Sequence, residues 1–574
     1  MNIIFSFMQN FMQGAPSELV IVTEIGVLII IATIFAFLIR MSKQPLIPAY
    51  IITGIIVGPL LLGLIRDAEL IISLSQIGVA FLIFTAGLEI KFKKLKEVGG
   101  VSAIGGILQI VIMFAIAFGI SMALGFIGMA PVYIGLVVAF SSTMIVVTLL
   151  AEKKEINSLH GRIIIGILLV QDLVAIVALT VLSSDLSFNS IIFVIGKALI
   201  FGVVAFILSK AVNPIFRKAA DNREMLLLVS ISLLFLFVIG SFLADLSLVI
   251  GAFFAGVALA NSNYKTEIQG SISSIREFFA VIFFIALGMQ LNLISSKFIL
   301  LLVVLFILVI IVKPLFIMLL VRLSGYKKRT SFLTGNALAQ TSEFALVIVT
   351  LGLMLGHINQ GLFSVLVLLT ILTMSLTSYF ITYERKLATL FSWPLNFLEG
   401  IKTRKEQLEY LKKDDKKTII FGCHRMGSLI LKEFEKNKKD LIVVDYNPEI
   451  IKSLMDKKIP CIYGDFMHEE ILEKIGLRHA EMIISTVPDF EDNLLLVKKT
   501  KKMNKKTVVI VVASRISEAR SLYEAGADYV ILPKVIGGEK AIDLVKKVKR
   551  NKRSLGELRK RHRRHLESIH HLLY

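Results

Sequence analysis

The sequence predicts a polytopic α-helical membrane protein that continues into an α/β domain. Of the 574 residues, 56% are hydrophobic and 18% are charged, which is more apolar surface than a soluble fold of this length could bury. Long apolar runs fill the chain up to residue 383, and basic residues recur in every second connection between them. Beyond residue 417, short apolar strands alternate with amphipathic helices.

Residues 1–383 form the predicted membrane domain, with about thirteen segments of spanning length. We expect them near 19–39, 46–65, 70–88, 100–127, 131–151, 161–183, 188–214, 224–243, 245–262, 274–292, 297–321, 330–355 and 360–382. The positive-inside rule places the basic connections and the C-terminal domain in the cytoplasm and the N-terminus outside. It also explains most of the net charge of +20, so we expect membrane lipid as a partner and no nucleic acid.

Polar residues in the middle of two neighbouring segments predict an ion site. Gln171 and Asp172 lie halfway along the span at 161–183, at a depth where an ionisable side chain costs about 2.5–3.5 kcal/mol. Three hydroxyl residues interrupt the preceding span: Ser141, Ser142 and Thr143. Hydroxyls, freed carbonyls and a carboxylate are the oxygen ligands that a monovalent cation accepts in place of water. We predict that Asp172 is an ion and proton site, with potassium or sodium as the metal.

Two further polar features lie within the membrane segments. Lys313 is too deep to reach either interface easily, and Pro314 loosens the helix beside it. This lysine can serve the ion site or hold the bundle together by pairing with a carboxylate or a helix C-terminus, and the residues favour neither role. Four polar residues interrupt a later span: Gln340, Thr341, Ser342 and Glu343. Interruptions at corresponding places of two halves predict an inverted-repeat transporter with its site at their crossing.

The remainder of the chain divides into three parts. Residues 384–416 mix charged and apolar residues, and we expect linker helices there. Residues 417–545 repeat strand then helix, which predicts a Rossmann-like parallel sheet with helices on both faces. Both cysteines, Cys423 and Cys461, lie in this domain, which fits a reducing cytosol. Residues 546–574 are expected to form a basic tail that is solvated or lies on anionic lipid.

The turn GCHRMG after the first strand of the α/β domain has features of a dinucleotide site. Gly422 and Gly427 would let the backbone approach a pyrophosphate at a helix N-terminus, and Asp445 would accept ribose hydroxyls. His424 replaces the middle glycine of the usual pattern, while Arg425 can still meet phosphate. A domain that kept this fold and lost its ligand remains the alternative.

Several stretches together carry a family resemblance. In the membrane part these are GVAFLIFTAGLEIKFKKLK, AFSSTMIVVTLLAEKKEINSLHGRIIIGILLVQDLVAI, IREFFAVIFFIALGMQLNL and LAQTSEFALVIV. In the α/β domain they are IIFGCHRMG, IVVDYNPE and YGDFMHEEIL. The set resembles the monovalent cation:proton antiporter family of bacteria and archaea, specifically its potassium-efflux Kef type with a C-terminal RCK domain, also called KTN or TrkA-N.

The resemblance implies a homodimeric antiporter with crossing discontinuous helices in the inner, cytoplasmic membrane. It assigns alternate binding of cation and proton to Asp172 and places Lys313 beside that aspartate. Gln171 is similar to the potassium-type members, because sodium-selective relatives usually have Asn or Asp there. The segments 141–143 and 340–343 match the unwound segments that cross in the family.

In the α/β domain the resemblance implies a regulatory nucleotide, either NAD(H) or one of AMP/ATP type. Asp445 and Asp465 match acidic positions that contact its ribose and adenine. Ser342 departs from the family's usual glycine, and the chain ends without room for a full second RCK subdomain, so glutathione gating does not carry over from the resemblance. An accessory cytosolic subunit stays open.

We therefore expect a potassium:proton antiporter, and not an enzyme, that works by alternating access under nucleotide regulation. One alternative is a sodium:proton antiporter of the same fold. Another is an RCK-gated potassium channel, against which the lack of a sequence like TVGYG counts. A dehydrogenase is not expected, because no catalytic acid or substrate domain accompanies the nucleotide-type domain.

Overall fold

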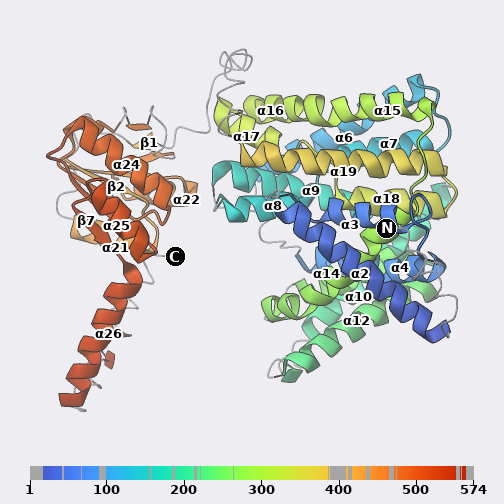
Figure 1. Cartoon of the computed structure of the whole chain (residues 1–574), viewed down its shortest axis with the longest axis horizontal. Helices are drawn as coiled ribbons and strands as arrows, with labels where there is room; N and C mark the ends of the chain where they lie inside the picture. Colours follow the sequence, from blue (N-terminus) through green and yellow to red (C-terminus); the bar gives the residue numbers. More distant parts are fainter. Residues whose placement is uncertain are drawn as a thin grey trace. The chain divides into compact units, whose positions relative to one another are not determined.

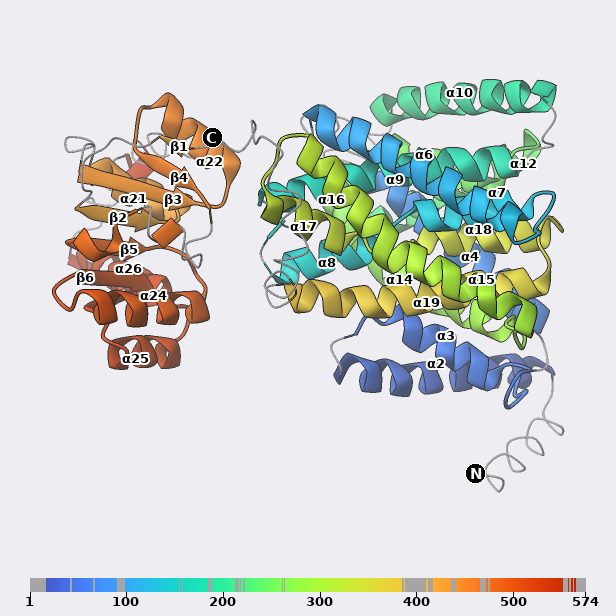
Figure 2. The same ribbon diagram turned by 90° about the horizontal axis from the view of Figure 1, so that it is seen from above.

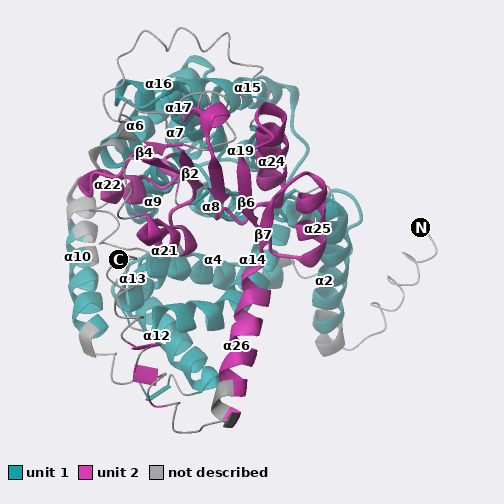
Figure 3. Cartoon of the chain, turned by 90° about the vertical axis from the view of Figure 1, so that its left-hand side faces the viewer, with its two compact units in different colours: residues 1–156, 160–403 teal, residues 157–159, 404–574 magenta. Residues whose placement is uncertain are grey.

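The computed structural model describes residues 17–41, 44–65, 68–89, 99–153, 155–156, 158–183, 188–211, 216, 218–219, 222–260, 262, 264–384, 387, 409–410, 417–434, 440–464, 471–472, 475–550, 556, 559–560 and 562–563. The chain falls into two compact units (Figure 3). One contains residues 1–156 and 160–403, and the other contains residues 157–159 and 404–574.

The first unit is a bundle of apolar helices. The continuous ones are α2 (Ser17–Met41), α3 (Ile47–Val57), α4 (Ala68–Glu89), α6 (Gly99–Ala123), α9 (Leu159–Leu182), α10 (Phe188–Ala211), α12 (Arg223–Leu243), α13 (Leu248–Ala260), α14 (Lys265–Met289) and α19 (Gln360–Thr382). Within the described residues, nine helical stretches are long and apolar enough to cross a membrane, and four shorter apolar helices accompany them. The helical membrane fold is confirmed, while the number of spans stays a prediction.

One segment is shorter than expected. The helix predicted over 46–65 covers only α3 and ends at Val57. Gly58 follows in an extended conformation, with φ −73° and ψ −177°, and Pro59 comes next. Proline disfavours a helical conformation in the residue before it, so the helix ends there.

Two spans are broken in the middle, as their polar interruptions predict. α7 (Ala130–Ala139) and α8 (Thr143–Glu152) are the halves of one span, and α17 (Lys328–Ala337) and α18 (Glu343–Met354) are the halves of the other. Figures 1 and 2 both show α8 and α17 near one end of the bundle and α7 and α18 near the other. The two breaks, at residues 140–142 and 338–342, therefore face each other inside the bundle, and we call this place the crossing. It is the arrangement of an inverted-repeat transporter.

A third span changes its helical form without breaking. α15 (Ser296–Ile307) passes through a π-helical turn, η1 (Leu308–Val312), into α16 (Lys313–Leu323). Pro314 occupies the first turn of α16, where its missing N–H removes one hydrogen bond of the helix. A π-turn is a frequent feature of functional sites, and here it comes directly before Lys313.

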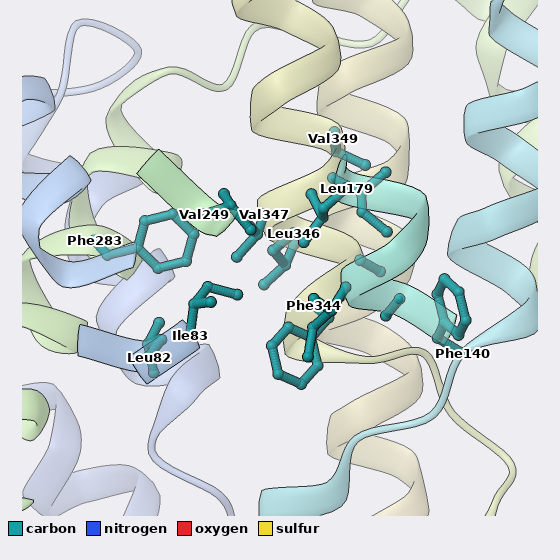
Figure 4. Close-up of a cluster of buried hydrophobic side chains, with 14 of the residues drawn as sticks. Leu82, Ile83, Phe140, Leu179, Val249, Phe283, Phe344, Leu346, Val347 and Val349 are labelled. Carbon is teal, nitrogen blue, oxygen red and sulfur yellow. The ribbon is translucent and has the colours of Figure 1, made fainter. Parts of the chain in front are cut away.

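Close contacts between glycines hold four helices together. A Cβ atom on Gly288 of α14 would lie 2.1 Å from the Ile51 oxygen of α3, and one on Gly256 of α13 would lie 2.1 Å from the Phe84 oxygen of α4. Only glycine fits at such distances. Around the breaks, the core consists of larger apolar side chains, including Phe344 and Leu346 of α18 and Leu179 of α9 (Figure 4).

The second unit contains a seven-stranded sheet of order β1-β4-β3-β2-β5-β6-β7. Its parallel strands are β2 (Thr418–Phe421), β3 (Leu441–Asp445), β4 (Cys461–Tyr463), β5 (Met482–Ser485), β6 (Val508–Val512) and β7 (Tyr529–Ile531). The helices are α21 (Arg425–Glu433), α22 (Pro448–Asp456), η4 (Leu477–His479), α24 (Phe490–Met503), α25 (Ile516–Glu524) and α26 (Pro533–Arg550). The predicted parallel α/β domain is confirmed. Its strand order reverses between β2 and β5, where ligands bind in such folds.

The linker differs from the prediction at the residues that the structure describes next to the sheet. Glu409 and Tyr410 form β1, which pairs antiparallel with β4, and not a helix. Pairing with β4 satisfies the backbone groups of an otherwise open sheet edge, which local sequence cannot reveal. Most of the segment 384–416 lies outside the described residues.

The glycine contacts lead to a stability prediction. We expect Gly256→Ala to destabilise the folded protein by about 1–3 kcal/mol, because the new methyl group overlaps the backbone of α4. Thermal unfolding in detergent measures this loss. Gly119→Ala on α6 is the matched control, since nothing lies within 4 Å of its Cβ position. Equal unfolding temperatures for the two variants would contradict the prediction.

Candidate functional site

Serines at the two breaks serve as helix caps. Ser142 Oγ accepts a hydrogen bond from Ile145 N at 3.3 Å at the start of α8, and Ser342 Oγ accepts one from Phe344 N at 3.1 Å at the start of α18. Each cap satisfies one of the N–H groups that a helix start leaves free. Two of the predicted ligand residues therefore shape the broken helices through their side chains.

Lys313 ties the two breaks together. Its side chain is fully buried, and Nζ donates to Phe140 O at 2.8 Å and to Gln340 O at 2.7 Å. These carbonyls follow the C-terminal ends of α7 and α17, where the helix dipole is negative, so a cation is favourable there. Lys313 and Asp172 are both among the described residues, and no ion pair joins them. The lysine contacts the crossing that encloses the aspartate and not the aspartate itself.

Asp172 offers a carboxylate at this crossing. The residue is half-buried on α9, and its Oδ2 accepts a hydrogen bond from Thr143 Oγ1 at 2.8 Å. Its other oxygen, Oδ1, accepts no hydrogen bond from the described residues. One oxygen of Asp172 is therefore attached to the first residue of α8, while the other is free to bind a cation or a proton.

Two more oxygens without partners come from the second break. Glu343 Oε1 accepts a long hydrogen bond from Met144 N at 3.3 Å, and Gln340 Nε2 donates to Ser142 O at 3.3 Å. Glu343 Oε2 and Gln340 Oε1 are buried and have no hydrogen-bond partner among the described residues. A buried oxygen without a partner is costly. The charge of Glu343 also acts on that of Asp172, so this part of the crossing is suited to a cation.

The remaining predicted residues fix the crossing. Ser141 Oγ donates to Leu338 O at 3.1 Å and so joins the two breaks directly. Thr341 bonds to Thr373 of α19 through both its backbone N, at 3.3 Å, and its hydroxyl, at 3.2 Å. Gln171 Oε1 accepts from Ser141 N at 2.8 Å. Sequence reasoning missed Thr373, because a threonine inside a helix gives no signal of its distant partner.

The turn after β2 has the geometry of a phosphate-binding loop. Gly422 has φ +79°, and a Cβ on Gly427 would lie 2.0 Å from Gly422 O, so both positions need glycine. His424 precedes α21 without a side-chain hydrogen bond to its first turn. The N–H groups of α21 therefore lack a side-chain cap in the described structure, which suits an anion. The Arg425 side chain and all of Asp465 lie outside the described residues.

Asp445 closes this turn. Its Oδ2 accepts from Cys423 N at 2.7 Å and its Oδ1 from Asn447 N at 2.8 Å. Burial raises the pKa of Asp445, although these backbone hydrogen bonds oppose the shift. Burial likewise raises the pKa of the Cys423 thiol to about 12, so that thiol is not a nucleophile at neutral pH. A carboxylate has about four acceptor sites, so these backbone hydrogen bonds do not use the full acceptor capacity of Asp445.

Comparison with known proteins identifies the family. Residues 27–382 match the model described as "Sodium/hydrogen exchanger, transmembrane", and residues 418–533 match the TrkA-N domain. The chain belongs to the sodium/hydrogen exchanger family. It is a multi-pass membrane cation/proton antiporter with a C-terminal TrkA-N domain, as its sequence predicts.

The chain is also similar to individual proteins. The chain is 28% identical over 542 residues to YbaL of Escherichia coli (strain K12), a protein named for an inferred cation/proton antiport, with 89% of this chain and 94% of YbaL covered. The sodium proton antiporter MjNhaP1 of Methanocaldococcus jannaschii is 15% identical, with 64% of this chain and 97% of that chain covered and a TM-score of 0.50. The crystal structure of the YbaL TrkA-N domain is 20% identical, with 23% and 98% covered and a TM-score of 0.23.

The position of Lys313 leads to a prediction about the fold of the crossing. Lys313→Met should leave the carbonyls of Phe140 and Gln340 without their donor, at a cost of about 1–3 kcal/mol for each buried group. Thermal unfolding in detergent measures the loss. Lys218→Met is the control, because Lys218 is exposed. Unchanged stability of Lys313→Met would show that the two hydrogen bonds do not hold the crossing.

Proposed function

We propose that the protein exchanges potassium for protons by alternating access at Asp172. The observation that carries this proposal is a set of three oxygens at the crossing that accept no hydrogen bond from the described residues: Asp172 Oδ1, beside the bonded Oδ2, and the buried Glu343 Oε2 and Gln340 Oε1. A partly dehydrated cation would gain oxygen ligands there that the protein otherwise leaves unused. A proton on Asp172 would remove the negative charge that attracts the cation.

Competition for one carboxylate couples the two fluxes. With Asp172 deprotonated, a cation can bind between the oxygens of α9 and those of the breaks; with Asp172 protonated, the charge needed to hold it is lost. Movement of the core between the two membrane faces then carries either a cation or a proton. Lys313 donates to two carbonyls, so its hydrogen bonds can stabilise the broken helices in both steps, and the lysine need not leave the aspartate when a cation enters.

Gln171 supports potassium as the cation, because potassium-type members of the family resemble this chain at that position. The competing proposal is sodium, which MjNhaP1 transports by its name. The likeness to MjNhaP1 is a likeness of fold and favours neither cation. An assay that compares the two ions on the same protein decides between them.

The TrkA-N domain is proposed to regulate transport by binding a nucleotide, NAD(H) or one of AMP/ATP type. Support comes from the tight glycine turn after β2, from the start of α21, which has no side-chain cap among the described residues, and from Asp445, which ends β3 and bonds to that turn. His424 and Gly427 would lie beside the pyrophosphate, and Asp445 would accept the ribose hydroxyls. We further propose that the protein is not an enzyme, that it is a homodimer and that this domain faces the cytoplasm.

Transport by reconstituted protein tests the ion site. We expect acid-loaded proteoliposomes to release protons when potassium is added, and Asp172→Asn to lose this response. Thr143→Val should raise the KM for the cation by roughly tenfold, because it removes the hydroxyl that orients Asp172. Asp245→Asn is the control, since Asp245 is an exposed residue of the loop after α12. Proton exchange that survives in Asp172→Asn would overturn the proposal.

Nucleotide binding should depend on pH through Asp445. The ionised carboxylate accepts ribose hydroxyls, so affinity is present above its folded pKa and is lost as the pH falls through that value. Because burial raises this pKa, the loss should begin at a higher pH than for an ordinary aspartate. Titration of the full-length protein with NAD(H), AMP and ATP measures it. Asp445→Asn should bind weakly at every pH, whereas the exposed control Asp440→Asn should behave like the native protein.

A further inference from the structure

A buried glutamine outside the predicted site is connected to it. Gln109 lies in the middle of α6 with 1% of its surface exposed, and Gln171 is fully buried on α9 beside Asp172. Gly106 brings the two helices together, because a Cβ on it would already lie 3.2 Å from Val170 Cβ. A glutamine amide has two N–H donors and an acceptor oxygen, and burying them without partners is costly. The donors and acceptors of both buried amides therefore require hydrogen-bond partners within the protein.

The two amides form a clamp on the first break. Gln171 Nε2 donates to Gln109 Oε1, Gln171 Oε1 accepts from Ser141 N at 2.8 Å, and Gln109 Nε2 donates to Ala139 O at 2.9 Å. Ala139 O and Ser141 N are backbone groups beside the end of α7, where the helix no longer provides partners. The clamp replaces the hydrogen bonds that the break leaves out.

The chemistry of the break fixes the orientation of both amides. Ser141 N–H requires an acceptor, so Gln171 must present its oxygen there and its nitrogen to Gln109. Ala139 O requires a donor, so Gln109 must present its nitrogen there and its oxygen to Gln171. The two requirements agree at the contact between the amides, and flipping either one would place like groups together. An ionised carboxylate at position 109 has no donor for Ala139 O. An apolar residue there offers neither that donor nor an acceptor for Gln171.

This arrangement changes the role expected for Gln171. Both ends of its amide are already bonded to protein, whereas Asp172, the next residue, reaches Thr143 two residues further along the break. Adjacent residues of α9 thus hold the break at two points. The Asp172 contact must rearrange when a cation or proton binds, but the amide contact need not. The spacing of the break's oxygens from α9 is then set by the amides.

We infer that Gln109 is a positioning residue that acts through Gln171 to fix the spacing of the cation ligands and hence the preference between potassium and sodium. This inference rests on the proposed function, because it assumes that the cation binds at Asp172. Cations of different radius require different oxygen spacings, so a break that is free to shift relative to α9 discriminates less between them. Loss of the clamp should therefore affect cation choice more than the maximum rate.

The test is Gln109→Met, which keeps the length of the side chain and removes both hydrogen bonds. In the reconstituted full-length protein we expect the ratio of KM values for sodium and potassium to move toward unity by about tenfold, with a smaller change in kcat. Gln109→Glu should keep the native ratio, because a protonated carboxyl still donates to Ala139 O and accepts from Gln171. Ser121→Ala is the control, since among the described residues this buried α6 hydroxyl bonds only to Phe118 O of its own helix.

The outcomes separate this inference from the proposed function. A native protein that prefers sodium would overturn the choice of potassium, and the clamp would still be supported by a ratio that moves toward unity in Gln109→Met. An unchanged ratio in that variant, or a fall in kcat alone, would overturn the clamp. If Gln109→Met does not fold, Gln109→Asn applies the same test, because its shorter side chain cannot reach both Ala139 O and Gln171.

Discussion

The membrane part depends on one constraint, which is that backbone groups freed inside a membrane must find partners within the protein. Two helices are broken where they meet, and each break releases carbonyl and N–H groups that neither lipid nor the helix can satisfy. Lys313 takes two of the carbonyls, and Ser142 and Ser342 cap the helices that resume. The site exists because these residues meet most of that demand and leave a few oxygens unused.

The unused oxygens give the crossing its chemistry. Asp172 and Glu343 come from different elements, yet their charges act on each other because both breaks lie at one place. Two carboxylates in an apolar interior are costly unless a cation or a proton reduces their repulsion. Under the proposed function, a cation or a proton bound at these carboxylates would lower that cost, and exchange of one for the other is what antiport requires.

Other helices of the bundle are held by a different kind of contact. In the glycine contacts between α3 and α14 and between α4 and α13, backbones touch directly, so those helices have little freedom to slide. The broken helices are held instead by polar contacts, and one of these, between Thr143 and Asp172, involves the carboxylate that the proposed function assigns to the cation and the proton. In the TrkA-N domain a helix start again provides N–H groups, an arrangement that suits an anion, and Gly422 and Gly427 pack closely at the turn before it.

The sequence by itself determined the elements and their chemistry. Apolar length and interrupted segments predicted the membrane helices and the two breaks, and the strand-to-helix repeats predicted the α/β domain, because periodicity is local information. The tertiary structure alone decided which polar groups meet. Nothing in the chain near residue 313 indicates that the lysine binds the carbonyls of Phe140 and Gln340 rather than Asp172, and nothing near residue 109 links that glutamine to Ser141. Such partners are distant in the chain, and hydrogen bonds between them form only when the helices pack. The sequence therefore shows which polar side chains are present, and only the tertiary structure shows which groups they bind.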